Sequence, residues 1–166
     1  MQTVKTKVTL IAIVLLLSPM QLFALADDGQ QPIQVEADSL EVRDKDNISI
    51  YIGNVRLKQG SLEFRCDRLT LHFDDAKELA LMEMTGNPAT FRQLDDEGQA
   101  LKGQAEKLQY RQAESILVLS GNARFSHKGD IIESNIIQVN TEDESIQAGS
   151  SESDNRVRML IQPKQQ

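Results

Sequence analysis

One stretch of the chain decides the fold, because apolar and polar residues alternate in it on both sides of a Gly-Asn pair. It reads Ile48-Ser49-Ile50-Tyr51-Ile52-Gly53-Asn54-Val55-Arg56-Leu57-Lys58-Gln59. A period of two predicts a β-strand with one buried face, since successive side chains of a strand point to opposite faces. The pair Gly53-Asn54 indicates a turn with positive φ. The alternation continues downstream in Leu62, Phe64, Cys66, Leu69, Leu71 and Phe73.

Part of this pattern is repeated further along the chain. Ala37-Asp38-Ser39-Leu40 returns as Ala105-Glu106-Lys107-Leu108, and Gly53-Asn54-Val55-Arg56 returns as Gly121-Asn122-Ala123-Arg124, in both cases 68 positions later. A further Gly-Asn pair, Gly86-Asn87, lies between the two copies. Repeated modules that cannot bury their own apolar faces form a continuous core by stacking on their neighbours. We therefore expect an all-β fold of stacked strand modules, open at both ends and without helices.

The first 26 residues differ from the rest in composition. Lys5 and Lys7 precede an uninterrupted apolar run from Val8 to Leu17, and Ala24-Leu25-Ala26 offers the small residues of a signal-peptidase site. A membrane anchor is the alternative, but a spanning helix needs about 20 apolar residues. We predict a signal peptide over residues 1–26 that is cleaved on export.

Cleavage after Ala26 would leave a single domain over residues 27–166, ordered over about 31–161. The formal net charge of the chain is −7, and loss of Lys5 and Lys7 would lower it to −9. This balance disfavours nucleic acid or anionic head groups as electrostatically bound partners, so an anionic ligand would be held by its apolar part. Cys66 is the only cysteine. It lies in the apolar phase of its segment, which predicts an inert core thiol.

The sequence contains no pattern typical of an active site or of a metal centre. His72 and His127 are isolated, and the acidic residues are scattered over expected turns and solvent-facing strand positions. Catalysis or metal binding would need such groups to converge. We therefore expect a protein that is not an enzyme and has no cofactor or metal.

Four segments form an ordered series of landmarks: Pro32-Ile33-Gln34-Val35-Glu36-Ala37-Asp38, Gly53-Asn54-Val55-Arg56-Leu57-Lys58-Gln59-Gly60, Gly86-Asn87-Pro88-Ala89-Thr90-Phe91 and Leu119-Ser120-Gly121-Asn122-Ala123. Together these segments resemble the OstA-like family of lipopolysaccharide transport proteins, which includes LptA, LptC and the periplasmic part of LptD. The resemblance covers essentially the whole chain after the signal peptide. The expected cleavage and the end of the chain at Gln166 favour the LptA type, because LptC keeps an N-terminal anchor and LptD continues into a large barrel.

The resemblance implies a twisted antiparallel β-jelly roll that is open along one side and located in the periplasm. Its apolar interior would take the acyl chains of the lipid A part of lipopolysaccharide, while sugars and phosphates stay in water. It also implies head-to-tail assembly with LptC-like and LptD-like partners and with further copies of the chain. The candidate lipid-binding residues are Ile33, Val35, Leu57, Phe64, Leu71, Phe91, Leu108, Leu119 and Phe125.

An open jelly roll leaves backbone donors and acceptors unpaired at both ends, which makes those edges candidates for strand addition. We expect the edges to be Ile33-Gln34-Val35 at one end and the strand with Val157, Met159 and Ile161 at the other.

Two alternatives remain at this point. Each interior residue could fill an ordinary core, so a structural or scaffolding β-protein of the cell envelope without a lipid ligand is possible. A parallel β-helix lyase would share the repetition, but such enzymes have longer chains and cluster acids and bases on one strand face.

Overall fold

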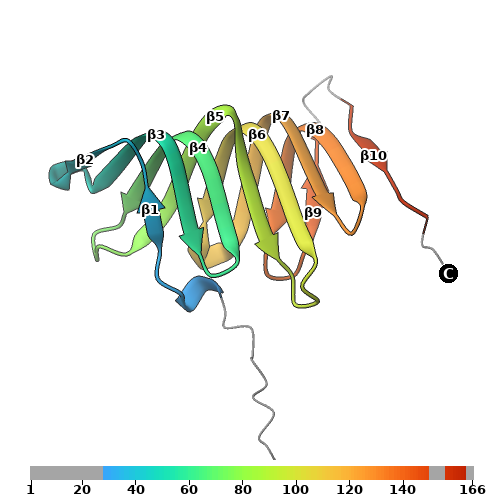
Figure 1. Ribbon diagram of the computed structural model, residues 1–166, viewed down its shortest axis with the longest axis horizontal. Helices are drawn as coiled ribbons and strands as arrows, with labels where there is room; N and C mark the ends of the chain where they lie inside the picture. The colour runs from blue at the N-terminus through green and yellow to red at the C-terminus, as the bar shows by residue number, and fades with distance from the viewer. Residues whose placement is uncertain (1–27, 150–155, 164–166) are drawn as a thin grey trace, which may run out of the picture.

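The computed structural model describes residues 28–149 and 156–163, so the predicted signal peptide lies outside the described residues. Ten antiparallel strands form one sheet (Figure 1). They are β1 (Gln34–Glu36), β2 (Ser39–Arg43), β3 (Ile48–Gln59), β4 (Leu62–Phe73), β5 (Leu79–Leu94), β6 (Ala100–Arg111), β7 (Ile116–His127), β8 (Asp130–Asn140), β9 (Ile146–Ala148) and β10 (Arg158–Leu160). Three short 3-10 turns are also present, at Asp28–Gln30, Asp44–Asp46 and Gln112–Glu114. In the described part of the chain no helix is long and apolar enough to cross a membrane. The predicted all-β open sheet is confirmed.

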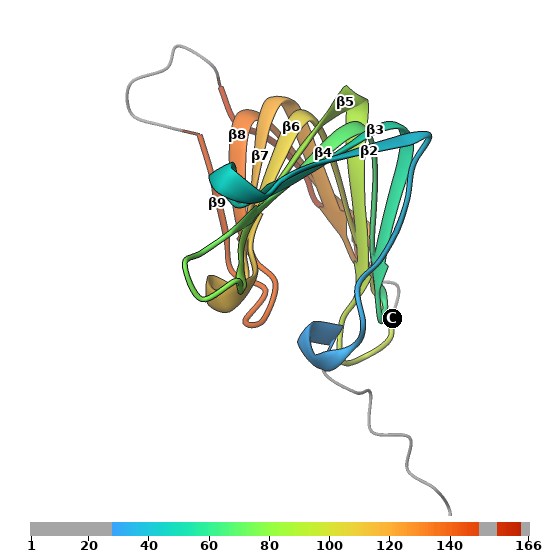
Figure 2. The same ribbon diagram turned by 90° about the vertical axis from the view of Figure 1, so that its left-hand side faces the viewer.

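The sheet is bent along a line that crosses its long strands. Every pairing from β3–β4 to β7–β8 shifts register near the middle of the strands, and such β-bulges bend a sheet. We call the two halves wall A and wall B. Wall B contains β1, β10 and the strand halves over residues 55–66, 89–105 and 123–134, and wall A contains β2, β9 and the other halves. Figure 2 shows the two walls meeting along the bend and standing apart at their free rims.

The two Gly-Asn pairs of the repeat lie at this bend. Gly53 and Gly121 have φ of +84° and +80°, and Asn54 and Asn122 both have φ of 48°. Asn54 donates a hydrogen bond to Asp38 at 2.8 Å, and Asn122 donates one to Glu106 at 2.6 Å. A Cβ atom on Gly53 would lie 2.3 Å from the Asp38 carboxylate, so the close approach requires glycine.

The predicted positive φ is therefore found, but the prediction of a chain-reversing turn is wrong. Both pairs lie inside long strands, at bulges, because the ladder resumes on either side of them. Gly86, the glycine of the intermediate pair, does not have positive φ.

The core lies between the walls. The Phe64 ring of wall B packs against Phe91 of the same wall, with centroids 5.6 Å apart, and against Tyr110 of wall A at 5.9 Å. Cys66 is 8% exposed in this core, and burial raises the pKa of its thiol to about 12, as expected for an unreactive core residue.

Sequence alternation gave the wrong face for the first half of β3. Tyr51, not Ile50, faces the interior, because Tyr51 is directly opposite the fully buried Leu69 of β4. Ile48, Ile50 and Ile52 therefore lie on the outer face of wall A, where Ile50 is nevertheless buried, with 2% of its surface exposed. Ile50 and Tyr51 are neighbours and both are suited to a buried position, so the alternation alone does not show which of them faces the interior. The pairing register with β4 does.

The folded region also begins earlier than predicted. We expected order from about residue 31, but Asp28–Gln30 forms a 3-10 turn. The Asp28 carboxylate accepts hydrogen bonds from the backbone amide of Ser61 at 2.7 Å and from its hydroxyl at 2.6 Å. These contacts fix the turn to the β3–β4 connection.

Candidate functional site

Seven of the predicted lipid-binding residues come together between the walls. Wall A supplies Leu71, Leu108 and Leu119, and wall B supplies Leu57, Phe64, Phe91 and Phe125. All seven are buried, with at most 6% of their surface exposed. Ile33 and Val35 are partly buried and pack against the same cluster. The interior is thus one continuous aliphatic and aromatic layer, and contact of these residues with lipid stays a prediction.

Polar residues of both rims line the free side of this layer. A cavity of about 610 Å³ lies there, bordered by Asp28, Gln59, Gln93 and Asp95 of wall B and by Gln112, Ser115, Thr141 and Glu144 of wall A. Few contacts cross it. Gln112 Nε2 lies 3.4 Å from the Gly29 carbonyl and 3.5 Å from Gln59 Oε1, and these are long hydrogen bonds.

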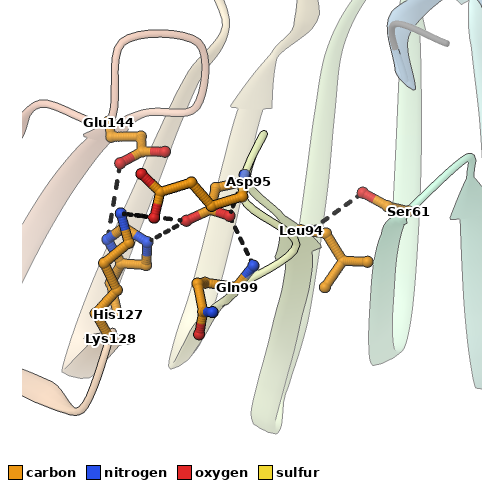
Figure 3. Close-up of polar contacts among 8 residues, drawn as sticks. Ser61, Leu94, Asp95, Gln99, His127, Lys128 and Glu144 are labelled. Carbon is orange, nitrogen blue, oxygen red and sulfur yellow. Dashed lines mark hydrogen bonds and ion pairs between the residues drawn. The ribbon is translucent and has the colours of Figure 1, made fainter. Parts of the chain in front are cut away.

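A second contact across the rims involves His127, which Figure 3 shows between Asp95 and Glu144. His127 Nε2 lies 2.8 Å from Asp95 Oδ2, and His127 Nδ1 lies 3.9 Å from Glu144 Oε2. The same Asp95 carboxylate accepts backbone hydrogen bonds from Glu97 at 2.9 Å and Gln99 at 2.7 Å. The sequence-based view that His127 is isolated is therefore wrong, since the loops that follow β5 and β8 bring Asp95 and Glu144 to the end of β7.

This cluster also meets the distance condition for a metal site, with ligand atoms of Asp95, His127 and Glu144 within 4.8 Å of one another. However, the two carboxylates approach opposite nitrogens of one ring, and Lys128 Nζ already lies 3.6 Å from Asp95. The arrangement is that of a network of hydrogen bonds and ion pairs rather than of donors converging on one ion.

The network makes stability depend on pH. Burial by itself favours the neutral form of Asp95, but hydrogen bonds from His127 and from the Gln99 and Glu97 amides, together with Lys128, outweigh it and hold the pKa of Asp95 below the usual 3.8. The stabilisation is therefore complete above about pH 3.8 and is lost as pH falls through the lowered pKa.

We predict that the melting temperature of Asp95→Asn falls less between pH 7 and the acid range than that of the unchanged protein. Asp96→Asn is the matched control, because Asp96 is exposed in the same loop. Thermal unfolding at a series of pH values checks this. Parallel curves for Asp95→Asn and the unchanged protein would contradict the assignment.

The first end of the sheet exposes apolar residues that face the interior. Leu40 and Val42 of β2 share a face with Tyr51, because Leu40 is opposite Tyr51 in the β2–β3 register. They are 55% and 57% exposed, whereas the residues 68 positions later, Leu108 and Tyr110, are 0% and 6% exposed. In the second unit β5 pairs with β6 beside Leu108 and Tyr110, whereas no described strand lies beside Leu40 and Val42 on the side away from β3. The interior layer therefore ends uncovered at β2.

The second end of the sheet is similar. Met159 of β10 is opposite the inward-facing Ile132 and is 56% exposed. Val157 and Ile161 continue its alternation and are 46% and 66% exposed, and Ile146 of β9 is 36% exposed. Within the described ranges β1 and β2 pair only with β3, and β9 and β10 pair only with β8. Both ends thus present unpaired backbone together with uncovered apolar side chains.

The predicted edges, Ile33-Gln34-Val35 and Val157, Met159 and Ile161, lie at these two ends (Figure 1). Sequence reasoning missed Leu40 and Val42 as edge residues. A usable signal was present, since Leu40 and Val42 alternate with the polar residues Ser39, Glu41 and Arg43 at the start of the first repeat unit.

A single bent sheet that encloses an apolar layer and leaves both ends unpaired is the architecture of an open β-jelly roll. The family model described as "LptA/(LptD N-terminal domain) LPS transport protein" matches residues 34–145. The chain belongs to this family.

Individual relatives agree with this assignment. The lipopolysaccharide export system protein LptA of Escherichia coli K12 is 28% identical over 152 residues, which cover 91% of this chain and 82% of the relative. LptH of Pseudomonas aeruginosa is 30% identical over 148 residues, covering 85% of each chain. A crystal structure of LptH, described as the LptA-homologous periplasmic component of the lipopolysaccharide transport device, superposes with a TM-score of 0.75 and 29% identity, and covers 82% of this chain and 99% of its own. These relatives are named as components of lipopolysaccharide export and not as enzymes.

Proposed function

We propose that this chain is a periplasmic carrier that binds lipopolysaccharide by its lipid A acyl chains and forms part of a protein bridge toward the outer membrane. The observation that carries the proposal is the continuous apolar layer between two walls whose ends are both uncovered. Each methylene group left in water costs about 0.8 kcal/mol. A lipid with several long acyl chains therefore needs a covered path across the aqueous space.

Side chains of the protein fill the space between the two walls. Acyl chains could therefore enter only if the walls move apart. The free rims are suited to this, because the contacts that Gln112 makes across them are long, at 3.4 and 3.5 Å, and His127 and Glu144 lie 3.9 Å apart. The bend along the opposite side would act as the fixed edge. Leu57, Phe64, Leu71, Phe91, Leu108, Leu119 and Phe125 would then exchange contacts with each other for contacts with the lipid.

Tethering the rims tests this mode of entry. We expect Gln30→Cys/Gln112→Cys, joined by a short thiol-to-thiol crosslinker, to remain folded and to lose capture of lipopolysaccharide. Gln30 is exposed on one rim, and Gln112 of the other rim reaches the carbonyl of the adjacent Gly29. The native Cys66 thiol is buried and should not compete for the reagent. The uncrosslinked double variant is the control and should bind as the unchanged protein does.

A scaffolding protein with a permanently filled core gives a different result, because neither the crosslinked nor the free form would take up lipid. Uptake by both forms would instead contradict entry through the rims. Co-purification with lipopolysaccharide, followed by mass analysis, distinguishes these outcomes.

Assembly into a bridge follows from the directions of the edge strands. β1 and β10 lie in wall B and β2 and β9 in wall A, so each end offers one strand to each wall. Because every strand is antiparallel to its neighbour, β10 would pair antiparallel with β1 of a following copy, and β9 with its β2. The contact joins two different edges, so it extends as a filament.

The internal repeat also gives the register of this joint. Met159 of β10 is opposite Ile132, and 68 positions earlier Phe91 of β5 is opposite Phe64. Phe91 is in turn opposite Gly103 of β6, whose counterpart 68 positions earlier is Val35 of β1. Met159 would therefore be opposite Val35 of the next copy, which places Arg158 opposite Glu36.

The same edges would serve the ends of the bridge. LptC-like and LptD-like partners carry related domains, so an LptC-like inner-membrane protein and an LptD-like outer-membrane protein could add strands at the two ends. Directionality would come from these partners.

A further inference from the structure

The outer face of wall B has a charge opposite to that of the whole chain. The pairing registers place seven basic residues and three acidic residues on it: Arg56, Lys58, Arg65, Arg92, Lys102, Arg124 and Arg158, with Glu36, Glu63 and Glu133. The formal net charge of the chain is −7. The net charge thus hides a local basic face, and the sequence-based exclusion of anionic groups does not hold for this surface.

Two of the three carboxylates of this face, Glu63 and Glu133, are already paired with arginines. Glu63 pairs with Arg65 at 2.6 Å and with Arg56 at 3.2 Å, and Glu133 pairs with Arg124. Arg92 and Lys102 make no hydrogen bond or ion pair with any described residue. On the outer face of wall A, by contrast, Arg43, Lys107 and Arg111 each pair with a carboxylate.

Arg92 and Lys102 are also directly opposite each other in the β5–β6 register. Like charges in this position destabilise a sheet, and an anion between them would remove the repulsion. They border a hollow of about 350 Å³, together with Glu63, Arg65, Thr90, Gln104, Arg124 and Ser126. Glu63 is the acidic residue of this lining, and its carboxylate is already paired with Arg65 and Arg56. That volume is at the lower end of the range of small-molecule sites, and the hydroxyl and amide groups add uncharged hydrogen-bonding partners.

We propose that this hollow binds a phosphate group carried by a small polar molecule, such as a sugar phosphate. Arginine donates paired hydrogen bonds to phosphate oxygens, and lysine acts on them as a point charge. The site lies on the outer face and is separate from the apolar interior, so it goes beyond the proposed lipid function and does not depend on it.

Nuclear magnetic resonance titration of the unchanged protein tests the site with three probes. Inorganic pyrophosphate tests the anion alone, glucose 1-phosphate tests a phosphate on a sugar, and glucose is the uncharged control. We expect the amide resonances of Thr90, Lys102 and Gly103 to shift saturably with both phosphates and not with glucose. The affinity should fall at about 1 M salt, where the Debye length is about 3 Å.

Two double variants separate this site from a general effect of charge. Arg92→Gln/Lys102→Gln should bind about tenfold more weakly. Lys107→Gln/Arg111→Gln removes the same charge from wall A and should bind as the unchanged protein does. Equal weakening in both variants, or no saturable shift with either phosphate, would overturn the proposal. Uptake of lipopolysaccharide into the interior is measured separately, so failure here leaves the carrier function intact.

Discussion

Replacing Leu108 by aspartate is expected to unfold the domain, whereas the same replacement at Leu40 is expected to leave it folded. The two residues occupy equivalent positions of the repeat, 68 positions apart, and differ in what covers them. Leu108 is 0% exposed and Leu40 is 55% exposed. A carboxylate at position 108 would lie in the apolar layer without a partner, at a cost of several kcal/mol. That is a large part of the roughly 5–15 kcal/mol that stabilises an ordinary domain.

Urea unfolding followed by circular dichroism measures the free energy of unfolding of both variants. Both variants replace leucine by aspartate, so a difference in their free energy of unfolding reports the difference in burial of the two positions. Similar losses of stability in Leu108→Asp and Leu40→Asp would mean that the first end of the sheet is covered within the single chain. The account of an uncovered end would then be wrong.

Two copies of the chain are expected to form a disulfide when one carries Val35→Cys and the other carries Met159→Cys. The repeat places these residues opposite each other across the joint, and directly opposite Cβ atoms of antiparallel strands lie about 4.5–5.5 Å apart. That is close to the separation a disulfide needs. Neither variant alone should crosslink, since the joint brings together two different edges.

The control for this register is Glu36→Cys mixed with Met159→Cys. A shift by one residue turns a side chain to the other face of the sheet, so this mixture should form little dimer. Non-reducing electrophoresis reads out all combinations. Equal dimer in both mixtures would contradict the register, and none in either mixture would contradict strand addition between β10 and β1.

Much of the fold could be predicted because two features of the sequence extend along the chain, the alternation of apolar residues and the internal repeat. The alternation of apolar residues gave the strands, and the displacement that relates Gly53 to Gly121 gave a repeated unit. Its side-chain contacts are repeated in the structure as Asn54 to Asp38 and Asn122 to Glu106. The seven central interior residues could be chosen because six of them have a polar residue on both sides in the sequence, and Leu119 has one on one side.

The predictions that were wrong have a common physical cause. Each concerns a feature that depends on which distant segments of the chain lie side by side. Ile50 and Tyr51 are both suited to a core, and only the register with Leu69 assigns the inner face to Tyr51. His127 at the end of β7 seemed isolated because Asp95 and Glu144, which contact it, lie in loops that are distant in the sequence. The basic face of wall B was not predicted because its residues come from strands far apart in the sequence. The composition gives only the net charge of the whole chain, in which the acidic residues outnumber the basic ones.

The central claim is that acyl chains lie between the walls, and site-specific photocrosslinking at neighbouring positions tests it most directly. Phe91 faces the interior and is 2% exposed, while the next residue, Arg92, lies on the outer face of the same strand. A photoreactive amino acid placed at each position in turn would be irradiated in the presence of lipopolysaccharide, and the products would be analysed by mass. We predict a lipid adduct at position 91 and little or none at position 92. Adducts at position 92 alone, or in equal yield at both positions, would contradict transport of lipid through the interior.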